Sequence, residues 1–209
     1  MPSVMARTGT DEWLIEALRA GDEEAFEQLV HRYHGPLMRL ARGYVASQGV
    51  AEEVVQDTWL AVLDGIDRFR GASSLKTWIF SILIKRATTR GVRERRSVPF
   101  SSLHPTADDD GPSVSSDRFG ADGHWAVPPR PFDLPEDRAG LLELRAYIRA
   151  ALAALPERQR IVVALRDVEG LSSDEVCGLL HLSVENQRVL LHRGRARLQA
   201  ALAEYRVEP

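Results

Sequence analysis

The sequence predicts an all-α protein in which two small helical domains are joined by a long acidic linker rich in Pro and Gly. Three observations support this prediction. Apolar residues recur at helical spacings over residues 11–96 and again over residues 141–204. No stretch shows the strict alternation expected of a strand. Between the two helical parts, over residues 97–140, the periodicity stops and seven prolines appear.

The first domain is divided into helices by capping residues and glycines. Asp11 is predicted to cap the first helix, Gly21 to end it, and Asp22 to start the second. A third helix is expected over residues 51–64, and a fourth begins at about Leu75 after a loop that contains Gly71. The inward positions of the third and fourth helices are Val54, Val55, Thr58, Trp59, Val62, Trp78, Ile79, Ile82 and Leu83.

The net charge of −3 conceals two opposite local charges. Residues 81–100 contain six Lys or Arg and one acid, whereas residues 101–140 contain eight acids and three Arg. A basic patch at the end of the fourth helix suits a polyanionic partner, and the linker is acidic. Trp125, an aromatic residue within the linker, is expected to dock either on a domain of this chain or on a partner.

Residues 170–198 predict a helix-turn-helix. Ser172 or Ser173 can cap the first helix, His181 begins the turn, and Ser183 can cap a second helix that runs to about Leu202. That second helix carries several arginines and is suited to the major groove of DNA and its phosphates. A plain helical hairpin with a solvated arginine face is the alternative interpretation.

Several classes of protein are disfavoured by the composition. The lone Cys177 and the lack of an apolar signal segment point to a reducing cytoplasm and to no membrane partner. The sequence contains no phosphate-binding glycine loop, nucleophile motif or zinc spacing. His31 and His34 are spaced three residues apart on a helix, but no third metal ligand lies near them in the sequence. We therefore expect no enzyme activity, no metal and no cofactor.

In their order, the motifs resemble the extracytoplasmic-function (ECF) group of bacterial RNA polymerase sigma factors, members of the sigma-70 family. The resemblance is carried by AEEVVQDTWL at 51–60, FRGASSLKTWI at 69–79, LPERQR at 155–160 and LHRGRARL at 191–198. It implies that residues 11–96 are region 2, residues 97–140 the linker and residues 141–204 region 4.

The resemblance also implies which residues of region 2 contact partners. Those expected to dock on core RNA polymerase are Glu53, Gln56 and Asp57; a solvated helix face is the alternative. Those expected to recognise and melt the minus-ten promoter element are Phe69, Arg70, Ser73, Ser74, Lys85, Arg86 and Arg90. Phe69 and its loop would capture a flipped base, and the basic residues would follow the DNA backbone.

In region 4, the second helix of the helix-turn-helix would read the minus-thirty-five element. The expected contact residues are Glu185, Asn186, Gln187, Arg188, His192, Arg193 and Arg195. Asn and Gln can pair with adenine and Arg with guanine, whereas Arg193, Arg195 and Arg197 are better placed for phosphates. The family more usually has Thr-Val-Lys-Ser-Arg at residues 186–190, so Gln187 replaces an apolar residue. The family often has Asn where Lys85 stands. These departures leave the promoter sequence open.

The function implied is that of a sigma factor, with promoter DNA and core RNA polymerase as partners. Whether an anti-sigma factor is a further partner is left open. The acidic linker would follow the nucleic-acid channel of the polymerase or would simply be solvated. A stand-alone helix-turn-helix transcriptional regulator is the alternative. Such a regulator would dimerise on a two-fold site and would not need the motifs of residues 51–96.

Overall fold

The structure is a computed structural model that describes residues 5–97 and 138–205. The chain divides into two compact units, residues 1–103 and 104–209. Within the described residues every regular element is a helix and none is a strand. This confirms the all-α prediction. Trp125 and the acidic stretch of the predicted linker lie outside the described residues.

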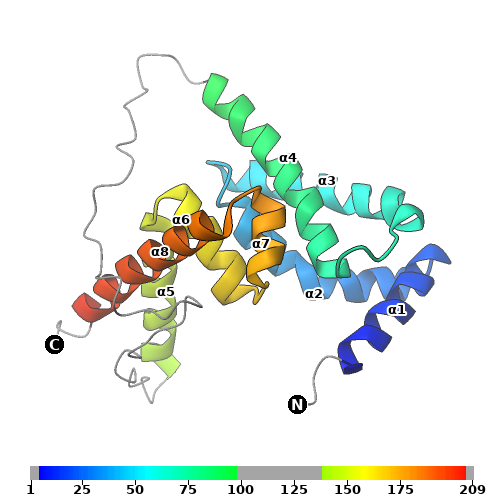
Figure 1. Cartoon of the computed structure of the whole chain (residues 1–209), viewed down its shortest axis with the longest axis horizontal. Helices are drawn as coiled ribbons and strands as arrows, with labels where there is room; N and C mark the ends of the chain where they lie inside the picture. Colours follow the sequence, from blue (N-terminus) through cyan, green and yellow to red (C-terminus); the bar gives the residue numbers. More distant parts are fainter. Residues whose placement is uncertain (1–4, 98–137, 206–209) are drawn as a thin grey trace. The chain divides into compact units, whose positions relative to one another are not determined.

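Over residues 5–97, the first unit is built from four α-helices and one short 3-10 turn (Figure 1). They are α1 Met5–Arg19, α2 Glu23–Ala41, α3 Gln48–Gly65, η1 Ile66–Arg68 and α4 Leu75–Ser97. Helix α3 packs against both α2 and α4, and α2 and α4 also contact each other. Leu29, Leu37, Phe80 and Leu83 are completely buried, so the core lies among α2, α3 and α4.

The ends of these helices test the predicted caps. Asp22 caps α2 as expected, because its side chain accepts a 3.0 Å hydrogen bond from the Ala25 N–H. The predicted cap at Asp11 is wrong, since α1 begins at Met5 and Asp11 lies inside the helix. The third helix starts three residues earlier than predicted, at Gln48, because Ser47 accepts from the Val50 N–H at 3.1 Å.

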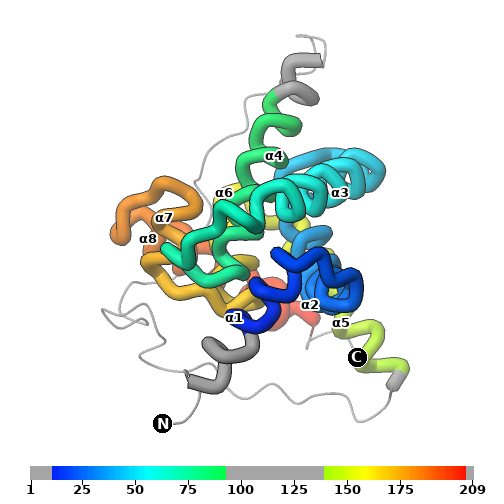
Figure 2. The backbone as a smooth tube through the Cα atoms, turned by 90° about the vertical axis from the view of Figure 1, so that its right-hand side faces the viewer, coloured from blue at the N-terminus to red at the C-terminus, as the bar shows by residue number. Residues whose placement is uncertain are grey.

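The second unit is also helical. Over residues 138–205 its elements are α5 Arg138–Ala154, α6 Glu157–Val163, the π-helical turn η4 Ala164–Val168, α7 Ser173–Leu180 and α8 Val184–Tyr205. Helix α8 packs on α5, α6 and α7. Figure 2 shows α7 beside α8. Gly194 allows the close approach of α8 to α6, because a Cβ atom there would lie 2.6 Å from Cγ2 of Val163.

The helix-turn-helix prediction is confirmed by α7, α8 and the turn between them. Ser172 caps α7 in a reciprocal capping box with Glu175, which also settles the choice between Ser172 and Ser173. His181 ends α7 in the left-handed conformation, with φ +53°. Ser183 accepts from the Asn186 N–H at 3.2 Å at the start of α8.

Candidate functional site

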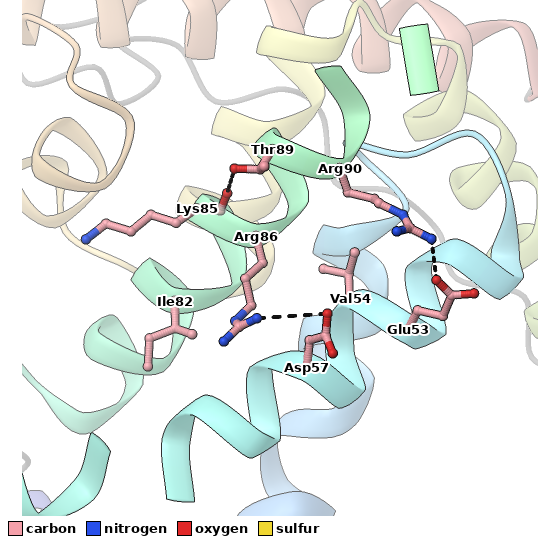
Figure 3. A pocket seen from close by; sticks show the side chains of 8 residues that line it. All are labelled: Glu53, Val54, Asp57, Ile82, Lys85, Arg86, Thr89 and Arg90. Carbon is pink, nitrogen blue, oxygen red and sulfur yellow. Dashed lines mark hydrogen bonds and ion pairs between the residues drawn. The ribbon is translucent and has the colours of Figure 1, made fainter. Parts of the chain in front are cut away.

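A cleft between α3 and α4 brings together two sets of charged residues that the sequence analysis assigned to different partners. Figure 3 shows Asp57 of α3 paired with Arg86 of α4, and Glu53 paired with Arg90. The Nη1 atom of Arg86 lies 3.9 Å from the Oδ2 atom of Asp57. The cleft has a volume of about 480 Å³. Its lining residues are Glu53, Val54, Asp57, Ile82, Lys85, Arg86, Thr89 and Arg90.

These ion pairs leave the charges open to solvent. The Arg86 and Asp57 side chains are 41% and 60% exposed, and those of Arg90 and Glu53 are 42% and 61% exposed. Exposed pairs of this kind contribute only about 0–1 kcal/mol, so a charged partner can replace either member. Arg86 and Arg90 can therefore exchange a carboxylate for a phosphate without a large loss of stability.

The outward face of α3 contains two apolar residues that the sequence analysis did not assign to a partner. Leu60 is 56% exposed and Leu63 is 43% exposed. They follow Glu53 and Gln56, which are also exposed, at helical spacings of three and four, so all four residues share one face. A helical projection of residues 48–65 would have shown this pair of leucines beside polar residues on the exposed face.

The loop between η1 and α4 has a buried start and an exposed middle. Phe69 is 6% exposed and packs on Trp78, with ring centroids 5.0 Å apart. The expectation that Phe69 stacks on a flipped base does not hold in this structure, because its ring contributes to the core. Arg70 and Ser73 are exposed, whereas Ser74 caps α4 by accepting from the Thr77 N–H at 3.1 Å.

Arg19 of α1 anchors the start of this loop. Its guanidinium donates to the backbone oxygen of Ile66 at 3.4 Å and to that of Phe69 at 2.5 Å. The sequence analysis did not single out Arg19, because its partners lie 47 and 50 residues away. Only the packing of α1 against η1 reveals the contact.

The first turns of α8 present a polar surface. Glu185, Asn186 and Arg188 are exposed, as the sequence analysis expected, and Val189 beside them is 46% exposed. Gln187 differs, because it is only 1% exposed and faces the interior of the unit. The expectation that Gln187 reads a base edge is therefore corrected.

The basic residues farther along α8 are partly engaged within the unit. Arg195 forms two hydrogen bonds to the Asp167 carboxylate, at 2.6 and 2.9 Å, and its side chain is only 15% exposed. Arg197 donates to Oε1 of Gln159 at 2.8 Å. Arg195 thus links α8 to η4, and a phosphate at this position would have to displace the Asp167 carboxylate.

His192 and Arg193, also expected at the DNA, are half-buried. Burial, and secondarily the positive charge of Arg195, lowers the pKa of the His192 imidazole from its ordinary value of 6.5. The neutral form of His192 is therefore favoured in the folded unit. A neutral imidazole gains little from a phosphate, which makes His192 a weaker electrostatic contact than its position suggests.

Among the described residues, no group of His, Cys, Asp or Glu is arranged to bind a metal ion. The same part of the chain has no helix long and apolar enough to cross a membrane. The candidate sites are the charged cleft between α3 and α4 and the polar surface of α8. The described helices define an all-α protein with a helix-turn-helix, a motif that many proteins use to enter the major groove of DNA.

Comparison with known proteins narrows this class. The family described as Sigma-70 region 2 matches residues 29–97, and the family described as Sigma-70, region 4 matches residues 145–198. Among curated proteins, the chain is 29% identical to the ECF RNA polymerase sigma-E factor of Escherichia coli K12 over 191 residues, covering 91% of this chain and 93% of that one. The sigma-E factor of Haemophilus influenzae is 27% identical over 195 residues, covering 93% and 96%.

Two solved structures share the fold. CnrH, solved in complex with the cytosolic domain of CnrY, aligns with a TM-score of 0.56 at 24% identity, covering 93% of this chain and 97% of that one. The sigma factor RpoE of Bartonella quintana, solved with the anti-sigma factor NepR, aligns with a TM-score of 0.57 at 22% identity, covering 88% and 98%.

The chain therefore belongs to the ECF group of the sigma-70 family. It is a sigma factor, a non-enzymatic protein that directs the initiation of transcription. The two family matches, one in each unit, favour this function over that of a stand-alone helix-turn-helix regulator, which would not need a region 2.

Proposed function

We propose that the two units divide the work of promoter recognition. In this proposal residues 11–96 act as region 2, residues 97–140 form the acidic Pro/Gly-rich linker, and residues 141–204 act as region 4. Region 2 docks on core RNA polymerase and opens the minus-ten element, and region 4 reads the minus-thirty-five element. The protein acts in the cytoplasm, where its polymerase and promoter DNA are found.

The docking surface that we assign to core polymerase is the outward face of α3. The observation that carries this assignment is the exposure of Leu60 and Leu63 beside Glu53, Gln56 and Asp57. Apolar residues bordered by polar ones are the usual composition of a protein interface, with an apolar centre and a charged rim. A solvated helix face would not need two exposed leucines three residues apart.

For the minus-ten element we assign the exposed loop residues Arg70 and Ser73 together with Lys85, Arg86 and Arg90 of α4. The loop is held by Arg19 at its start and by the Ser74 cap at its end, so it presents a short, anchored segment to an unpaired base. The basic side chains of α4 lie on a half-exposed surface and would contact phosphates, which contribute affinity and salt dependence.

For the minus-thirty-five element we assign Glu185, Asn186 and Arg188, which are exposed in the first turns of α8. These residue types can pair with cytosine, adenine and guanine edges in the major groove. Arg193 would contact a flanking phosphate. Because CnrH and the Bartonella quintana RpoE were each solved with a bound regulatory partner, we also propose that an anti-sigma factor binds this chain.

Run-off transcription with purified bacterial core polymerase and genomic fragments tests the proposal. The full chain is compared with Asp57→Lys and Leu60→Glu, which disturb the α3 surface. Glu27→Lys, an exposed acidic residue on α2, is the matched control for the change in charge. We expect discrete start sites with the wild-type chain, loss of transcription and of co-elution with core for the two α3 variants, and normal activity for Glu27→Lys.

Full transcription by Asp57→Lys and Leu60→Glu would contradict the assignment of α3 as the docking surface. Wild-type binding to duplex DNA as a dimer, without co-elution with core, would contradict the division of work between the units.

A further inference from the structure

Gln187 is a buried polar residue in the middle of the helix-turn-helix. It lies on the inner side of α8 and is 1% exposed. Its Oε1 atom accepts a 3.0 Å hydrogen bond from the hydroxyl of Ser173, the first residue of α7. Its Nε2 atom is also buried and has no hydrogen-bond partner among the residues that the structure describes. The amide is therefore only half satisfied.

Both residues of this hydrogen bond lie near the start of a helix, where further hydrogen bonds hold the backbone. Ser173 follows the cap Ser172, whose hydroxyl accepts from the Glu175 N–H at 3.2 Å. The backbone N–H of Gln187 donates to the oxygen of Ser183, the residue that caps α8, at 2.9 Å. The bond thus joins the starts of the two helices.

A hydrogen bond constrains geometry more tightly than apolar contact does. Apolar side chains can slide past one another with little loss, but a donor and an acceptor must keep their distance and angle. The Ser173–Gln187 bond therefore opposes rotation of α8 about its own axis relative to α7. Because residues 185, 186 and 188 flank Gln187 on the exposed side, such a rotation would move all of them.

The Nε2 atom without a partner gives a reason for this arrangement other than stability. A buried donor without a partner destabilises the folded state, and an apolar side chain of similar size would avoid that loss. Single buried polar residues are best known as devices that select one register over its neighbours. Gln187 has the burial and the partner that such a device requires.

We infer that Gln187 is a positioning residue which, through Ser173, sets the rotation of α8 and thereby the choice of minus-thirty-five sequence. This inference rests on the proposed reading of the minus-thirty-five element by α8. It assigns Gln187 no contact with DNA. According to this inference, a substitution of Gln187 changes the sequence preference of the unit without lowering its stability.

The test uses the full chain with core polymerase and a promoter library in which the minus-thirty-five positions are randomised. Wild type is compared with Gln187→Leu, Gln187→Met and Ser173→Ala. We expect Gln187→Leu and Gln187→Met to equal or exceed the wild type in Tm, and Ser173→Ala to be less stable. All three are expected to change the preference at one or more minus-thirty-five base pairs by roughly tenfold, while the minus-ten preference stays unchanged.

Gln159→Leu is the matched control. Gln159 is also buried, at 2% exposed, but it bonds to Arg197, near the other end of α8. We expect this variant to be less stable and to keep the wild-type minus-thirty-five preference.

Two results would overturn the inference alone. One is that the wild type selects a minus-thirty-five sequence and the Gln187 and Ser173 variants select the same one within twofold. The other is that Gln159→Leu changes the preference as strongly as they do. If the wild type transcribes but selects no minus-thirty-five sequence, the proposed role of region 4 fails together with the inference.

Discussion

The cleft of the first unit and the recognition helix of the second both contain arginines paired with acids, but at very different depths. Arg86 and Arg90 on α4 are more than 40% exposed, and so are their acidic partners on α3. Arg195 on α8 is only 15% exposed and bonds to Asp167 through two nitrogens. The difference separates two roles for one residue type. Arginines in the first unit remain available for a partner, whereas Arg195 positions the helix that carries the exposed reading residues.

The largest effect is expected from a substitution that forces α8 away from α6, because it disturbs the unit in which Arg195 is held. Gly194→Ala places a Cβ atom 2.6 Å from Cγ2 of Val163, which is itself 2% exposed. Overpacking costs about 1–3 kcal/mol, and the better helix propensity of Ala offsets up to about 1 kcal/mol. We expect a net loss of about 1–2 kcal/mol, measured by hydrogen exchange of α6 and α8 amides in the full chain.

Two controls make this prediction specific. Gly178→Ala, on α7, meets nothing within 4 Å, so it should be neutral or slightly stabilising. Val163→Ala in the Gly194→Ala background should recover part of the loss, because it removes the clashing methyl. An equal loss for Gly178→Ala would show that the close approach of the two helices is not the cause.

The second prediction compares the ion pairs directly. Double-mutant cycles should give Arg195–Asp167 a coupling of about 1–2 kcal/mol, because two charge-assisted hydrogen bonds form in a partly buried place. The exposed Glu53–Arg90 pair should give about 0.2–1 kcal/mol. Arg195→Lys should not restore the coupling, since an ammonium cannot form the bidentate contact. Equal couplings for the two pairs would remove the contrast between the units.

Sequence reasoning succeeded where the determinants are local. The caps at Asp22 and Ser183 and the turn at His181 follow from hydrogen bonds within three or four residues, and all are present. The start of α3 differs from the prediction because Ser47 is the cap and Gly49, a poor helix former, lies in the first turn. Two local signals therefore compete at this boundary.

The site residues were harder to predict because their roles depend on tertiary contacts. Phe69 is buried by Trp78, Gln187 is turned inward against Ser173, and Arg195 is engaged by a residue 28 positions away. A helical projection of α8 alone could have placed Gln187 on the inner side, since Leu191 lies four residues beyond it and is buried. The ion pair of Arg195 has no comparable signal in the sequence.

The third prediction concerns the exposed pairs of the first unit. Neutralising both acids in Glu53→Gln with Asp57→Asn should free Arg86 and Arg90 for phosphates. Binding of the free chain to a single-stranded oligonucleotide should tighten a few-fold. The salt dependence should steepen by about 0.7 in log–log slope for each new phosphate contact.

The same change in net charge at a distance provides the control. Glu12→Gln with Glu16→Gln, both exposed on α1, should leave the slope unchanged. If the two double variants alter the slope equally, overall charge explains the effect, and the pairing of α3 with α4 does not restrain the arginines.

The smallest expected effect is a pH dependence from His192. Burial first, and then Arg195, lowers the pKa of its imidazole below 6.5, so the unfolded chain binds a proton more readily than the folded one. The contribution to stability is therefore complete above about pH 6.5 and is lost as the pH falls toward the lower folded pKa. His192→Gln should flatten the stability of α8 between pH 5.5 and 7.5, as measured by hydrogen exchange.

An NMR titration of the His192 ring separates the two causes. Arg195→Met removes the positive charge but leaves most of the burial, so the pKa should rise and yet stay below 6.5, because burial is the larger cause. A wild-type pKa at or above 6.5 would mean that α8 is more open to solvent at His192 than the packing indicates. That outcome would weaken the contrast between an exposed arginine set on α4 and a fixed one on α8, since Arg195 lies less than one helical turn beyond His192.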